Sequence, residues 1–200
     1  MPDPPTAFLD ACVLYPSLVR GALLAAADHG RYRPAWSPRV LAEWRIAALR
    51  DGAEEAGLDK AVAAMTALYP GALAAHDPDL EASLQLPDPA DVHVLAGAVS
   101  AGATMLVTFN LRDFPTRRLA RFGIEPRHPD GLLWQALSEA PDTLGVTIAA
   151  LLAACGISEP RAGRKALKRA LLPRLGKAWE AWAAGPGSPS THRRTDIDRR

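Results

Sequence analysis

Four carboxylates in separated parts of the chain stand where an apolar run ends or a helix begins. They are Asp10, Glu43, Asp91 and Asp113. A carboxylate at the end of a buried strand, or in the first turn of a helix, loses hydration, which costs free energy unless another group binds it. Clustered carboxylates are the oxygen ligands that hard cations such as Mg²⁺ and Mn²⁺ prefer. They predict metal-assisted hydrolysis of a phosphodiester, in which the ion lowers the pKa of a bound water.

The elements that must position these acids alternate between strand and helix. Apolar runs predict strands over residues 7–10, 32–36, 72–75, 105–109 and 123–125. Helical patterns, with Ser37, Asp130 and Asp142 as expected caps, cover 17–30, 38–50, 53–68, 89–100, a short stretch ending at 122, 131–140, 142–154 and 161–183, the last interrupted by Pro173. Residues 76–86 are expected to be a polar loop.

This alternation predicts an α/β fold, a three-layer α/β/α sandwich around a short, mainly parallel sheet, followed by C-terminal helices. Ligands of such sheets gather at the carboxyl ends of the strands. Asp10 and Asn110 both stand at the carboxyl end of an expected strand. We therefore expect their side chains to meet at one edge of the sheet.

Composition favours a cytoplasmic protein with no membrane segment. The chain has 200 residues and is 48% hydrophobic, enough for one domain with an appendage. Cys12 and Cys155 form no disulfide framework, which fits a reducing compartment. The first residues lack the features of a signal peptide, and the longest apolar stretch, 145–157, is too short to span a bilayer.

Charge is unevenly distributed along the chain. Residues 1–160 carry 19 Asp and Glu against 12 Lys and Arg, whereas residues 161–200 carry 3 against 11. A basic C-terminal segment is typical of proteins that bind a polyanion or an acidic partner. It is equally consistent with a solvated tail.

Four motifs in a fixed order resemble one known family. They are Phe8-Leu9-Asp10 with the following residues to Pro16, Trp36-Ser37 leading to Leu41-Ala42-Glu43-Trp44-Arg45, Asp88-Pro89-Ala90-Asp91-Val92-His93, and Val107-Thr108-Phe109-Asn110-Leu111-Arg112-Asp113. With them the chain resembles the PIN-domain ribonucleases, and among these the VapC-type toxins of bacterial toxin–antitoxin pairs. The resemblance covers about residues 6–128, and Arg127-His128-Pro129-Asp130 resembles a segment that follows the core in one subgroup.

The resemblance implies a catalytic metal site with Mg²⁺ or Mn²⁺ as the ion. Its ligands and catalytic acids would be Asp10, Glu43, Asp91 and Asp113, with Asp88, Thr108 and Asn110 as auxiliary residues. The chain departs from the family pattern at Cys12, where a small polar residue is usual, and at Asn110, where many relatives have Asp. Glu43 or Asp91 would orient the attacking water as general base.

The sequence thus predicts a metal-dependent endoribonuclease, the toxin of a toxin–antitoxin pair. We expect RNA as substrate, 5′-phosphate and 3′-hydroxyl product ends, a cognate antitoxin and a homodimer. The expected boundaries are a nuclease domain over residues 1–128, a helical extension over 129–184 and a disordered basic tail over 185–200. Two alternatives stay open: a PIN-fold RNA-binding or interaction module with weak or no nuclease activity, and a DNA 5′-nuclease.

One histidine and several arginines remain to be interpreted. His93 is expected to be structural, because an oxygen-ligated site does not need an imidazole. Several arginines are candidates for contacts with the phosphate backbone or are ordinary surface charges: Arg45, Arg112, Arg117, Arg118 and Arg121.

Overall fold

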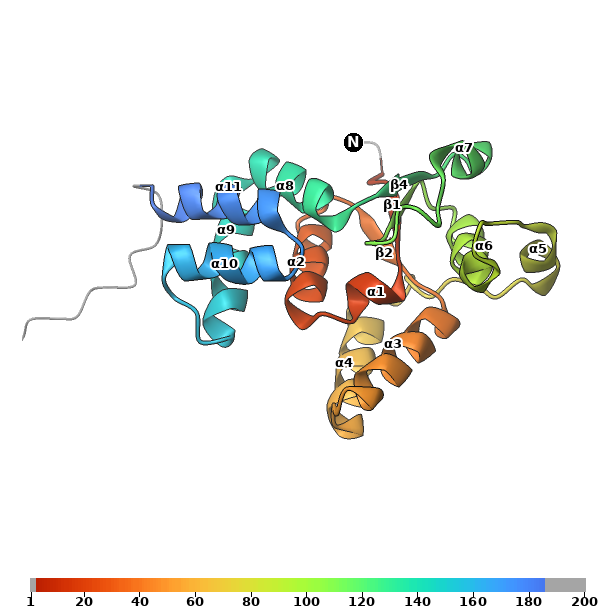
Figure 1. The fold of residues 1–200 in the computed structure, drawn as a ribbon, viewed down its shortest axis with the longest axis horizontal. Coiled ribbons are helices and arrows are strands. Elements are labelled where there is room, and N and C mark those ends of the chain that lie inside the picture. Colours follow the sequence, from red (N-terminus) through yellow and green to blue (C-terminus); the bar gives the residue numbers. More distant parts are fainter. Residues whose placement is uncertain (1–2, 186–200) are drawn as a thin grey trace, which may run out of the picture.

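A four-stranded parallel sheet lies at the centre of the fold in a computed structural model that describes residues 3–185 (Figure 1). The strands are β1 (Thr6–Leu9), β2 (Arg33–Ala35), β3 (Met105–Val107) and β4 (Glu125–Arg127). Their order across the sheet is β2-β1-β3-β4. The expected α/β class with a parallel sheet is confirmed.

The strand order reverses between the two central strands, because the chain places β2 on one side of β1 and then β3 and β4 on the other side. Strand β1 pairs with β2 on one side and with β3 on the other, where Leu9 stands opposite Val107. Both residues are fully buried, as expected for strands covered on both faces. Because all strands run the same way, their carboxyl ends share one edge of the sheet. In folds of this class ligands bind at that edge, close to the point where the strand order reverses. Asp10 and Thr108 are the first residues beyond β1 and β3 at this edge.

Helices connect the strands and cover the sheet. They are α1 (Ala11–Leu14), α2 (Ser17–Asp28), α3 (Pro38–Arg50), α4 (Glu55–Leu68), α5 (Pro78–Ser83), α6 (Val92–Ser100), α7 (Thr116–Leu119), α8 (Pro129–Glu139), α9 (Pro141–Ala154), α10 (Pro160–Arg169) and α11 (Pro173–Ala183). Short 3₁₀ turns precede α6 and follow α7, at Pro89–Asp91 and Ala120–Phe122. In Figure 1, α3 and α4 form a hairpin that projects from the body, and α8–α11 gather at one end. Within residues 3–185, no helix has the length and apolar character needed to cross a membrane.

The start of α3 follows directly from its sequence. The Ser37 hydroxyl accepts a hydrogen bond from the backbone N–H of Val40 at 3.1 Å. Pro38 takes the first helical position, where its missing N–H has no cost. Val40 and Trp44 are buried, whereas the side chain of Glu43 remains 40% exposed. The predicted cap and helix are confirmed, and they carry Glu43 to the margin of the core.

Helix α6 lies close to β1 because of Gly97. A Cβ atom added at Gly97 would lie 2.6 Å from the ring of Phe8, closer than non-bonded carbon atoms approach. A helix that connects parallel strands runs opposite to them, so its first turn lies at their carboxyl edge. Asp91, immediately before α6, is therefore brought to the same edge as Asp10.

Several local expectations are wrong. Residues 72–75 form no strand, and only Leu73 pairs with Trp36 in an isolated bridge. The expected loop 76–86 contains α5, whose first turn is capped by the Asp77 carboxylate accepting from the N–H of Leu80 at 3.0 Å. Helix α1 was not predicted, and β4 begins two residues later than expected. Elements of one turn are too short to show a hydrophobic period.

Helices α8 and α9 pack on α2, and α11 packs on α8, α9 and α10. A Cβ atom at Gly21 in α2 would lie 2.8 Å from the Leu151 side chain in α9. Arg31, just after α2, forms an ion pair of 2.8 Å with Glu139 in α8. The boundaries expected after residues 128 and 184 stay predictions, and the expected tail lies outside the described residues except for Gly185.

Asp130 performs a different task from the expected one. The cap of α8 is His128, whose Nδ1 accepts from the N–H of Asp130 at 3.2 Å. The buried Asp130 carboxylate instead accepts from the N–H groups of Arg174 at 3.0 Å and Leu175 at 2.9 Å, in the first turn of α11. A carboxylate there satisfies free helix N–H groups and complements the helix dipole. Asp142 also caps no helix, because α9 already begins at Pro141.

Candidate active site

The carboxyl ends of β1 and β3 place Asp10 beside Thr108. The Thr108 hydroxyl donates a hydrogen bond to Asp10 Oδ2 at 2.7 Å. The backbone N–H of Asp10 donates to the carbonyl of Val107 at 3.1 Å, which continues the pairing of the strands. Asp10 is only 8% exposed, and Thr108 is fully buried. The sheet register alone therefore fixes one carboxylate at the edge.

Cys12 supports the same carboxylate. Its thiol donates to Asp10 Oδ2 at 3.1 Å, lies 3.4 Å from the Thr108 hydroxyl, and accepts from the N–H of Phe109 at 3.3 Å. Burial, followed by the charge of Asp10, raises the pKa of Cys12 to about 12. The thiol therefore stays protonated at neutral pH and serves as a hydrogen-bond donor.

The loop after β3 adds Asn110 and Asp113. The N–H of Asn110 donates to the Thr108 hydroxyl at 3.0 Å. The side-chain amide of Asn110 donates to Asp113 Oδ2. Thr108 thus joins the strand ends to the loop, and Asn110 holds the last of the four predicted acids.

Glu43 lies between a buried imidazole and an arginine. His93 Nε2 lies 2.9 Å from Glu43 Oε1, and Arg39 Nε lies 3.4 Å from the same oxygen. Burial lowers the pKa of His93 to about 4, so the ring beside Glu43 is neutral. Its Nδ1 is buried and unpartnered within residues 3–185, which suits an unprotonated nitrogen. Burial raises the pKa of Glu43; Arg39 opposes this effect and Asp10 adds to it.

The negative charges of four other acids act on Asp91. Burial, and then the charges of Asp10, Asp88, Asp113 and Glu43, raise the pKa of Asp91 to about 6. Asp91 Oδ2 is buried and has no hydrogen-bond partner within the described part of the chain. An unpartnered buried carboxylate oxygen is costly, and a bound cation would offset that cost.

Asp88 helps to shape the turn that presents Asp91. Its carboxylate accepts from the N–H of Ala90 at 2.8 Å, and Pro89 begins the 3₁₀ turn that runs into α6. Asp88 therefore has a local structural task as well as a charge that acts on Asp91.

The residues suit a hard cation by chemical type and by charge, but they do not form a finished ligand set. No three Asp, Glu, His or Cys side chains between residues 3 and 185 are arranged to hold a metal ion. Asp10 and Asp113 are hydrogen-bonded to neutral groups, and Glu43 is paired with Arg39. Each of these contacts uses one carboxylate oxygen, as hydrogen bonds that orient metal ligands do, while Oδ2 of Asp91 has no partner within the described residues.

A cavity of about 830 Å³ opens beside Glu43. Arg39 and His93 line it, together with Glu81 of α5. Arg39 links α3 to α5, because its Nη1 lies 3.0 Å from Glu81 Oε1. Asp10, Glu43 and Asp91 do not line this cavity.

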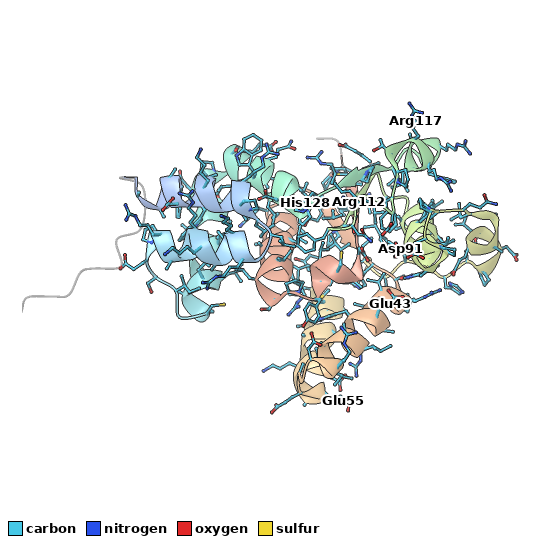
Figure 2. All side chains as sticks on the ribbon, in the orientation of Figure 1. Glu43, Glu55, Asp91, Arg112, Arg117 and His128 are labelled. Atoms are coloured by element: carbon cyan, nitrogen blue, oxygen red, sulfur yellow. The ribbon has the colours of Figure 1, made fainter. Side chains whose placement is uncertain are left out.

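The structure thus gathers the predicted acids but not all the predicted cations. Figure 2 shows Glu43 and Asp91 near one another, with Arg117 on α7 at the periphery. Arg45 is engaged by Glu55 and Asp59 on the α3–α4 hairpin. The role of the acids as metal ligands stays a prediction.

His93 is the site residue that sequence reasoning set aside. It contacts Glu43 directly and is only 5% exposed. The signal that could have identified it is its position two residues after Asp91, at the start of a helix whose first turn lies at the carboxyl edge.

Comparison with known proteins agrees with this geometry. Residues 6–112, more than half of the chain, match a family model described as a PIN domain. No curated protein sequence and no solved structure matches the chain. The matched range contains Asp10, Glu43 and Asp91, and Asp113 follows it directly. The family supports a nuclease-type function in general, and the chain belongs to the PIN-domain family.

Proposed function

We propose that this protein is a divalent-metal-dependent endoribonuclease and the toxin of a toxin–antitoxin pair. The main support is the electrostatic convergence on Asp91, whose pKa is raised to about 6 by burial and by four other carboxylates. Carboxylates packed in this way repel one another unless a cation lies among them. Membership of the PIN-domain family supports nuclease chemistry independently.

The proposed ligands of Mg²⁺ or Mn²⁺ are Asp10, Glu43, Asp91 and Asp113. When bound, the ion would lower the pKa of a water molecule and neutralise charge on the phosphoryl group. Asp91 is the first candidate for contact, because its Oδ2 is buried without a hydrogen-bond partner in residues 3–185.

The chain's own residues supply orientation and proton transfer. Thr108 and Cys12 hold the Asp10 carboxylate, and His93 holds Glu43. Glu43 or Asp91 would accept a proton from the attacking water as general base. Since water and not the ribose 2′-hydroxyl is the nucleophile, the products carry 5′-phosphate and 3′-hydroxyl ends.

Cleavage of a panel of structured RNAs by the full-length protein tests this proposal. Reactions would contain Mg²⁺, Mn²⁺ or EDTA, and Asp10→Asn would be compared with Asp59→Asn, a matched change at an exposed acid on the α3–α4 hairpin. We expect metal-dependent cleavage that Asp10→Asn abolishes and Asp59→Asn retains. Product ends with 2′,3′-cyclic phosphate would refute the proposed chemistry.

The partner proposals are a cognate antitoxin and a homodimer. Three exposed apolar side chains of the α3–α4 hairpin are the candidates for contact with another protein: Ile46 is 66% exposed, Leu49 41% and Leu68 68%. Expression should arrest bacterial growth, and Asp10→Asn should prevent the arrest. Light scattering would establish whether the chain is a dimer, and Ile46→Ser with Leu68→Ser should make it a monomer if these side chains form the interface.

One observation favours a second candidate, an RNA-binding module with weak or no nuclease activity. Within residues 3–185 the acids form no ready set of metal ligands, and most have protein partners. This alternative predicts RNA binding that is unchanged by EDTA, with no metal-dependent cleavage of any RNA in the panel.

A further inference from the structure

A second cavity lies where β4, α8 and α11 meet. It has a volume of about 610 Å³, and its lining includes Arg127, His128, Trp134, Gln135 and Arg174. Trp134 is 39% exposed, so part of its indole is accessible beside two guanidinium groups. Cations next to an exposed aromatic ring are typical of surfaces that bind single-stranded nucleic acid.

This cavity adjoins the edge of the sheet that carries the acids. Arg127 is the last residue of β4, and its carbonyl accepts from the N–H of Thr108 at 3.1 Å. The His128 ring packs edge-to-face against Phe109, with ring centroids 5.2 Å apart. In Figure 2, His128 lies between Asp91 and the group of helices α8–α11. A nucleic-acid strand that crosses the acids can therefore continue into the cavity.

Both arginines are held in place by neighbouring side chains. The Arg174 guanidinium lies over the Trp134 ring, 4.4 Å from its centroid, and forms no ion pair within residues 3–185. Arg127 donates to Gln135 Oε1 at 3.1 Å, and its contact with Glu125 is longer, at 3.4 Å. Fixed cations of this kind lose little side-chain entropy when they bind a phosphate.

Two acids lie beside this arrangement: Glu125, whose Oε1 is 3.4 Å from Arg127, and Asp130, which lines the cavity and whose carboxylate is already in use. Both of its oxygens accept hydrogen bonds from the first turn of α11. This cap fixes the backbone of Arg174 and therefore the point from which its side chain reaches Trp134. Asp130 thus orients the cationic lining without pairing with its guanidinium groups.

We propose that this cavity is a binding subsite for single-stranded RNA, in which a base lies against Trp134 and adjacent phosphates contact Arg127 and Arg174. The proposal rests on the nuclease function proposed above and specifies where the substrate strand lies beyond the acids. Charge complementarity and the exposed indole favour RNA over an acidic peptide, for which the aromatic ring would have no comparable partner.

Binding of a fluorescein-labelled single-stranded RNA tests the subsite without cleavage. Affinity is measured by anisotropy in EDTA, using the full-length chain with Asp10→Asn as background. We expect Trp134→Ala to weaken binding about tenfold and Trp134→Phe to restore most of it. Arg127→Gln combined with Arg174→Gln should reduce the slope of log affinity against log salt by about 1.4. Phe122→Ala, at a 40% exposed aromatic residue outside the cavity, is the control and should bind as the background does.

The outcomes separate the subsite from the nuclease function. If the wild-type protein cleaves RNA while the cavity variants bind RNA as the background does, that result would overturn the subsite alone. An acidic peptide would then be the remaining candidate ligand of the cavity. A protein that neither binds nor cleaves RNA would overturn both proposals. Equal losses in Trp134→Phe and Trp134→Ala would also contradict base stacking.

Discussion

His93 Nε2 on α6 and Glu43 Oε1 on α3 lie 2.9 Å apart. His93 is only 5% exposed, and Glu43 stands at the margin of the acidic edge. The contact fixes one carboxylate of the candidate site from a second helix. His93 is therefore a positioning residue, and it acts through Glu43.

Replacing His93 with Phe should remove this contact while filling the space. Because the contact positions a candidate general base, kcat should fall by about tenfold to a hundredfold, with KM for RNA little changed. His93→Gln, which retains a donor, should recover part of the loss. Steady-state cleavage kinetics measure this effect, with His29→Phe, at a residue bonded to Thr147, as control. A rise in KM alone would contradict the positioning role.

Metal affinity should depend on pH through Asp91. Its pKa, raised to about 6, means that Asp91 carries a proton below pH 6 in the metal-free protein, and a cation must displace it. Affinity for Mn²⁺ should therefore fall by about tenfold per pH unit below 6 and level off above 7. Calorimetric titration measures this, and Asp91→Asn should weaken binding and flatten the dependence. The same steep pH dependence in Asp91→Asn would assign the proton to another acid.

The two cysteines should differ in their reaction with iodoacetamide. Cys12 is half-buried with its pKa raised to about 12, so almost no reactive thiolate is present at pH 8. Cys155 is exposed and should be alkylated much faster. Mass spectrometry of peptides over time resolves the two sites, and unfolding in guanidinium should equalise them. Rapid labelling of Cys12 in the folded protein would mean that its thiol is not held beside Asp10.

Gly97→Ala should destabilise the fold, because the new methyl group would lie 2.6 Å from the Phe8 ring. Overpacking of this kind costs about 1–3 kcal/mol. Gly57→Ala is a matched control, since a Cβ there meets nothing within 4 Å, and it should stabilise α4 by about 0.5–1 kcal/mol. Chemical denaturation gives both values. Equal effects of the two changes would mean that α6 does not lie close to β1.

The sequence predicted the features that depend on long patterns or on strong local rules. The Ser37-Pro38 start of α3 and the two central strands are of this kind. It could not predict tasks that depend on tertiary contacts, such as the thiol of Cys12 donating to Asp10. Asp130 illustrates the limit, because its spacing suggests a local cap whereas its partners lie more than forty residues away in α11.

That long-range contact ties α11 to the start of α8, which follows β4 at the acidic edge. A chain shortened before α11 would deprive the Asp130 carboxylate of both its donors and expose the face of α8 on which α11 packs. Asp130 follows β4 by only three residues, so the disturbance would enter the sheet beside Thr108. Helix α11, which lies beyond the residues that match the family model, therefore stabilises the sheet edge where the acids meet. Its proteolytic loss should destabilise that edge.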